Sequence, residues 1–137
     1  MEQFFTFLGN HPILIGTFLL LIFLFFRNES ARAGATIGTQ ELVRLVNKEK
    51  AVVLDVRERG EFMEGHIVDA VNIPYASLES RVDELSQYKD SPVVIACKVG
   101  QHSGAAGTLL QKNGFTNVTR LTGGYSEWRA QNLPVVK

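Results

Sequence analysis

The sequence has 137 residues with 14 basic and 14 acidic side chains, so it has no net charge and gives no sign of a nucleic-acid partner. Its single cysteine can form neither an intramolecular disulfide nor a thiolate-rich zinc site. The length therefore predicts one domain with an ordinary hydrophobic core, plus a short appendage.

Residues 1–26 are predicted to be a membrane anchor. No charged residue occurs from Phe4 to Phe26, a run of 23 residues. At ~1.5 Å per residue such a helix would be about 34 Å long, enough to span a hydrocarbon core of ~30 Å. In a second interpretation, Asn10 caps a helix that opens with His11 and Pro12, and the preceding phenylalanines lie in the membrane interface. Both interpretations give one transmembrane pass.

The charges that flank this run predict its orientation. Arg27 and Arg32 follow it, whereas the N-terminal tail contains Glu2 and no basic residue. We therefore expect an inner (cytoplasmic) membrane location with the globular part facing the cytoplasm. A cleaved signal peptide, suggested by the triplet 31–33 (Ala-Arg-Ala), is the alternative, but the basic segment that begins such peptides is missing. Residues 27–38 are polar and small, and are expected to form a coil linker.

Helix and strand patterns alternate from Thr39, which is expected to cap a helix reaching about Lys48. The β-branched runs 51–56 and 93–97 are typical of strands buried on both faces of a parallel sheet. Further helices are expected at 58–64, 77–88 and 103–113 and around Trp128, with strands at 70–73 and 118–121. Residues 39–137 should therefore form an α/β domain with a mainly parallel central sheet flanked by helices.

Cys97 is the candidate nucleophile. It ends a predicted strand and opens the loop before the helix at Ser103, which is where α/β folds bind ligands. An ordinary cysteine thiol is only a few per cent ionised at neutral pH, and the reactive form is the thiolate. Free backbone N–H groups at a helix start favour the anion, Gly100 lets the loop curl, and Lys98 adds positive charge. The alternative is that Cys97 is a small, inert core residue.

Three stretches together carry a family resemblance. Residues 54–74 contain LDVRE, EF, GHI and AVNIP in order, the loop 97–103 reads CKVGQHS, and residues 121–134 contain LTGGY, a tryptophan and LP. In order and spacing they resemble the signatures of the rhodanese-like family over residues 39–137. By this resemblance, structural roles are expected for Asp55, Arg57, Gly65, His66, Gly123, Gly124 and Trp128.

Two residues depart from the family pattern. Asp69 stands where the family usually has glycine, which we expect to be a surface change of little consequence. His102 stands where the family often has arginine, which is permanently charged and can bind a sulfonate through two hydrogen bonds. Histidine is mostly neutral at pH 7, so His102 weakens the expectation that thiosulfate is the natural donor.

The resemblance implies a rhodanese-type sulfurtransferase that needs no metal or organic cofactor. Cys97 would carry sulfur from a donor such as thiosulfate to a thiol acceptor as a persulfide. The donor would be bound by the following residues of the loop: Lys98, Val99, Gly100, Gln101, His102 and Ser103. The membrane helix implies contact with lipid and with a membrane-protein partner.

Two other functions are consistent with parts of the sequence. A membrane-anchored adaptor with the same fold and little catalytic activity is suggested by the N-terminal helix and by His102. A cysteine phosphatase or arsenate reductase would need an arginine in the loop to hold its oxyanion. No arginine occurs between Cys97 and Arg120, which argues against that third function.

Overall fold

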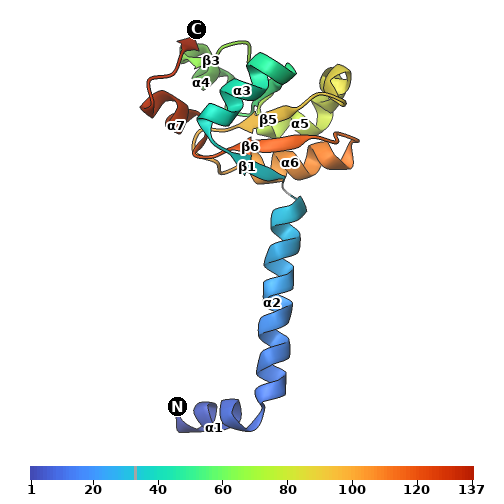
Figure 1. The fold of residues 1–137 in the computed structure, drawn as a ribbon, viewed down its shortest axis with the longest axis vertical. Coiled ribbons are helices and arrows are strands. Elements are labelled where there is room, and N and C mark those ends of the chain that lie inside the picture. Colours follow the sequence, from blue (N-terminus) through green and yellow to red (C-terminus); the bar gives the residue numbers. More distant parts are fainter. Residues whose placement is uncertain (33) are drawn as a thin grey trace. The chain divides into compact units, whose positions relative to one another are not determined.

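The computed structural model describes residues 1–32 and 34–137, which divide into two units, Met1–Ala31 and Arg32–Lys137 (Figure 1). The N-terminal unit contains helix α1 (Glu2–Asn10) and almost all of helix α2 (Pro12–Arg32). The second unit contains every β-strand of the described residues.

The N-terminal unit differs from the straight span expected from Phe4 to Phe26. The chain turns by 89° between α1 and residues 12–28 of α2. Pro12 is the cause, because proline disfavours a helical conformation at the residue before it, and His11 accordingly has φ −129° and ψ 56°. Asn10 ends α1 and does not cap α2. Among the described residues, no single helix meets the length and apolarity of a membrane span, although the bent pair does so together.

Residues 27–38 are not the coil that their composition predicts. Helix α2 continues through Arg32, since no glycine or proline interrupts residues 27–32. Strand β1 (Ala35–Ile37) then pairs in parallel with β6 (Val118–Leu121). Pairing with β6 satisfies the backbone hydrogen-bonding groups of β1. A stretch of three residues is too short for this pairing to show in the sequence pattern. Ala33, part of the signal-peptide triplet, lies outside the described residues.

The central sheet of the second unit has five parallel strands in the order β1-β6-β5-β2-β4. Its central strand is β5 (Val93–Ala96), which lies between β6 and β2 (Val52–Asp55), and β4 (Val71–Asn72) forms the other edge. A separate antiparallel pair joins β3 (His66–Ile67) to β7 (Val135–Val136). The predicted strands at 51–56, 70–73, 93–97 and 118–121 are all present, but β1, β3 and β7 were not predicted.

Helices cover both faces of this sheet, as the alternating pattern predicts. Side chains of Ile95 and Leu54 pack with α5 (Tyr75–Arg81), the 3-10 helix η1 (Val82–Tyr88) and α6 (Ser103–Lys112). Val94 and Val53 point to the opposite face and pack with α3 (Thr39–Glu49) and α7 (Gly124–Ala130). Helix α4 (Arg59–Glu64) connects β2 to β3. The α/β prediction is therefore confirmed.

Two helix boundaries differ from the sequence expectation. Thr39 is the first residue of α3 and Gly38 is its N-cap, because the Thr39 hydroxyl donates a hydrogen bond to the Gln131 side chain instead (2.6 Å). The helix expected over 77–88 changes at Val82 from α to 3-10 geometry. Leu78 and Leu85 are nevertheless both buried, so the apolar spacing still serves the core.

Candidate active site

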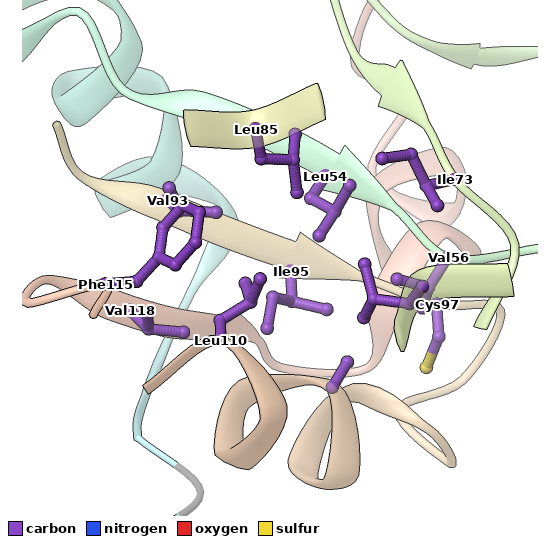
Figure 2. Close-up of a cluster of buried hydrophobic side chains, with 12 residues drawn as sticks. Leu54, Val56, Ile73, Leu85, Val93, Ile95, Cys97, Leu110, Phe115 and Val118 are labelled. Carbon is purple, nitrogen blue, oxygen red and sulfur yellow. The ribbon is translucent and has the colours of Figure 1, made fainter. Parts of the chain in front are cut away.

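Cys97 follows directly after β5, at the carboxyl edge of the sheet. Side chains alternate along a strand, so Cys97 points to the same face as Val93 and Ile95, the face covered by α6. Figure 2 shows it at the end of that apolar cluster, next to Val56, with its sulfur directed away from the other members. The residue is only 3% exposed, which keeps bulk water away from the thiol.

The sulfur is not sealed in apolar packing. The backbone N–H of Gly100 donates a hydrogen bond to Cys97 Sγ over 2.7 Å. Gly100 has φ +102°, a conformation that favours glycine and that turns this N–H back towards the sulfur. The Ser103 hydroxyl donates to the Gly100 carbonyl over 3.0 Å and so fixes the turn. Within the described residues, the expected ring of loop amides supplies this one hydrogen bond to the sulfur.

The start of α7 supports the other side of the loop. The N–H of Tyr125 donates to the Cys97 carbonyl over 2.7 Å, and the N–H of Ser126 donates to the Lys98 carbonyl over 3.0 Å. This approach requires glycine at position 124, where a Cβ atom would lie 2.2 Å from the Cys97 carbonyl oxygen. Gly124 also has φ +61°. The main chain of α7 therefore fixes where the Cys97 loop lies.

A pocket of about 380 Å³ opens above Cys97. We call it the Cys97 pocket; it is lined by Val56, Arg57, Glu58, Glu61, Tyr75, Ala76, Cys97, Lys98, Gln101 and His102. Four of the seven residues predicted for the site are therefore on its wall. Val99 is half exposed, Gly100 contributes its backbone N–H, and Ser103 is buried beneath the loop. The roles of these seven residues in binding a sulfur donor remain predictions.

Arg57 and Asp55 form a buried ion pair beside this pocket. Arg57 Nε lies 3.0 Å from Asp55 Oδ1, and Arg57 Nη2 lies 2.7 Å from Oδ2. The guanidinium group also donates to the Gly65 carbonyl over 2.8 Å and lies 3.8 Å from the centre of the Tyr125 ring. The expected structural role of this pair is confirmed. It connects β2 to the loop before β3 and to α7.

Three pocket residues with polar side chains were given no role from the sequence: Glu58, Glu61 and Tyr75. Glu58 and Glu61 follow the carboxyl end of β2, and Tyr75 follows that of β4. The rule that located Cys97, that functional groups gather beyond the carboxyl ends of parallel strands, applies equally to them. The Tyr75 ring stacks on His102, with centres 4.8 Å apart and planes 10° from parallel.

Comparison with known proteins identifies the domain. The model of the rhodanese-like domain matches residues 38–131. This chain belongs to the rhodanese-like family. It is 34% identical to YibN, an uncharacterized protein of Escherichia coli K12, and the match covers all of this chain and 99% of the length of YibN. A protein of Allochromatium vinosum named sulfurtransferase is 34% identical over 68% of this chain and 85% of its own length.

A solved rhodanese-related protein from Thermoplasma volcanium has the same fold. It is 30% identical, with a TM-score of 0.67 over 74% of this chain and 97% of its own.

The backbone conformation of Asp69 explains why the family usually has glycine at this position. Asp69 has φ +61°, in the region that favours glycine, so this chain places an aspartate in a strained turn.

Proposed function

We propose that this protein is a sulfurtransferase in which Cys97 carries sulfane sulfur as a persulfide. The observation that carries the proposal is the position of Cys97 Sγ, which faces the Gly100 N–H at 2.7 Å and lines a pocket of about 380 Å³. A backbone donor at this distance stabilises negative charge on sulfur. The relative named sulfurtransferase supports the same chemistry.

Thiosulfate illustrates the two half-reactions. The Cys97 thiolate attacks the outer sulfur, the S–S bond of the donor breaks, and sulfite leaves with the bonding electron pair. The product is the Cys97 persulfide anion, whose charge the Gly100 N–H offsets. A nucleophilic acceptor, such as cyanide or a thiolate, then takes the outer sulfur and regenerates the thiolate. Covalent catalysis of this kind gives ping-pong kinetics.

Mass spectrometry of the intact full chain tests the proposal. Incubation with sulfane donors should add one sulfur, about 32 Da, which cyanide should then remove. Cys97→Ser should accept no sulfur under the same conditions. If no donor in a panel of thiosulfate and alkyl persulfides adds mass, the sulfurtransferase assignment fails. Full cellular function of Cys97→Ser would then favour the adaptor.

We further propose that the N-terminal unit attaches the protein to a lipid bilayer, with the rhodanese-like domain on the cytoplasmic side. Phe18, Phe23 and Phe25 of α2 are each at least 60% exposed, and over residues 12–26 apolar side chains occur on every face of the helix. Such a helix needs an apolar environment. In α1, exposed Phe4, Phe5 and Phe7 suit the interfacial position considered from the sequence.

Flotation with phosphatidylethanolamine–phosphatidylglycerol vesicles tests this attachment. The full chain should rise with the vesicles, and the double variant Leu21→Asp, Phe25→Asp should remain in the dense fraction. Protease protection in membrane vesicles of known sidedness tests the orientation. A wild-type chain that stays in the dense fraction would contradict membrane attachment.

A further inference from the structure

The charged groups around the Cys97 pocket do not form a site for a small dianion. Lys98 Nζ lies 3.6 Å from Glu61 Oε1, so the exposed cation of the wall faces an acid of the same wall. Glu58 adds a second carboxylate to this wall and has no ion-pair partner among residues 1–28 and 34–137. Because Arg57 is paired with Asp55, the carboxylates of Glu58 and Glu61 face only one further basic side chain of the wall, that of Lys98, and acids therefore outnumber bases there.

Arg57 cannot take the place of the missing loop arginine as a sulfonate ligand. Its Nε and Nη2 atoms donate to Asp55 and to the Gly65 carbonyl, and its side chain is only 5% exposed. One face of the guanidinium group also lies over the Tyr125 ring. To bind a sulfonate with two hydrogen bonds, Arg57 would have to leave a buried carboxylate without its partner, which is costly.

Other residues of the pocket lining suit an organic group. Tyr75 and His102 stack on each other and give the pocket an aromatic surface, and Val56 and Ala76 line the pocket with them. Thiosulfate has no carbon to place against such a surface. An alkyl chain would lie on the aromatic surface, and a cation at its end would lie near Glu58 and Glu61.

We propose, on the basis of the proposed sulfurtransferase function, that the donor is an alkyl persulfide whose carbon skeleton carries a positive charge close to the sulfur. The Cys97 thiolate attacks the outer sulfur of R–S–SH. The donor S–S bond breaks, its electron pair leaves on R–S⁻, and Cys97 becomes the persulfide. One S–S bond is made and one is lost, so no oxidant or reductant is consumed.

Matched donors test this specificity. Cysteamine persulfide carries an ammonium group, and the persulfide of 3-mercaptopropionate carries a carboxylate at a similar distance from the sulfur. The rate of the 32 Da gain of the full chain is measured with each, and divided by the rate of the same donor with a free small thiol. We expect cysteamine persulfide to load Cys97 at least about tenfold faster than its carboxylate counterpart, and faster than thiosulfate.

Variants that remove the negative charge of Glu58 or Glu61 test the charge preference directly. Glu58→Gln should lower loading by cysteamine persulfide about fivefold and raise loading by thiosulfate by a similar factor. Adding Glu61→Gln should extend both changes. Asp90→Asn removes an exposed acid before the amino end of β5, at the opposite edge of the sheet, and should change neither rate.

The outcomes separate this inference from the proposed function. If Cys97 gains sulfur but the carboxylate donor or thiosulfate loads as fast as cysteamine persulfide, the charge preference is wrong and the sulfurtransferase assignment stands. Equal rates in wild type and Glu58→Gln would also overturn the preference. If no donor loads Cys97 at all, the proposed function itself fails.

Discussion

The Cys97 loop has two sides that are built differently. On the side of α7, main-chain groups hold it, with the N–H groups of Tyr125 and Ser126 bound to the carbonyls of Cys97 and Lys98. On the pocket side it presents the side chains of Lys98, Gln101 and His102, all three of which are exposed. We call these sides the floor and the rim. The floor fixes the position of the sulfur, and we propose that the rim is the side that selects the donor.

Gly124→Ala tests the floor and should have the largest effect on stability. The added Cβ would lie 2.2 Å from the Cys97 carbonyl oxygen, in a residue with φ +61°. We expect the free energy of unfolding to fall by about 4 kcal/mol or more, because a backbone atom cannot move aside as a flexible side chain can. Urea denaturation of the full chain in detergent, followed by the fluorescence of buried Trp128, measures this loss.

Gly60→Ala is the matched control for that variant. Gly60 lies in α4, where an added Cβ meets nothing within 4 Å. Alanine is the better helix former, so this change should raise stability by about 0.5 kcal/mol. Similar losses in the two variants would show that the close approach of α7 does not matter.

Arg57→Met tests the buried ion pair that connects the floor to β2. It would leave the Asp55 carboxylate without its cation at 1% side-chain exposure, and should cost about 3 kcal/mol. Adding Asp55→Asn removes the uncompensated charge and should restore more than half of the loss. No recovery in the double variant, measured by the same denaturation, would contradict this electrostatic explanation.

Lys98→Gln tests the rim. The Lys98 side chain is 68% exposed, so stability should change by less than about 0.5 kcal/mol. The rate at which thiosulfate adds sulfur to Cys97 should nevertheless fall about fivefold, because Glu61 loses its nearby cation. Lys112→Gln makes the same chemical change in the last turn of α6 and should leave the rate unaltered. A large loss of stability in Lys98→Gln would mean that the rim also supports the fold.

The floor and the rim also differ in how far the sequence could predict them. The position of Cys97 followed from a short apolar run and the rule that ligands bind at the carboxyl edge of a sheet. The glycines of the floor were expected to shape turns, but not to allow helix α7 to approach the Cys97 carbonyl. That contact joins residues far apart in the chain, and local patterns do not encode it.

Tyr75, Glu58 and Glu61 were missed for a related reason. Each follows a strand, but whether its side chain reaches Cys97 depends on how α4 and α5 pack on the sheet. Strand β1 was missed because three residues are too few to show a pattern, and its stability comes from pairing with β6. The break before Pro12 agrees with the second of the two sequence interpretations, in which a new helix opens there, although Asn10 does not cap it. The apolar count alone favoured a straight span, because it does not register the restriction that Pro12 places on its neighbour.

Asp69→Gly is the variant with the smallest expected change in stability, and it separates backbone strain from the close approach at Gly124. Asp69 and Gly124 both have φ +61°, but Asp69 lies in an exposed turn, whereas a side chain at 124 would meet the Cys97 loop. Replacing Asp69 should therefore remove conformational strain alone and raise stability by about 0.5 kcal/mol. That gain measures how much of the Gly124→Ala loss comes from φ, and the remainder comes from the close approach. A gain near 4 kcal/mol would assign the whole Gly124 penalty to backbone conformation and leave the floor without a steric role.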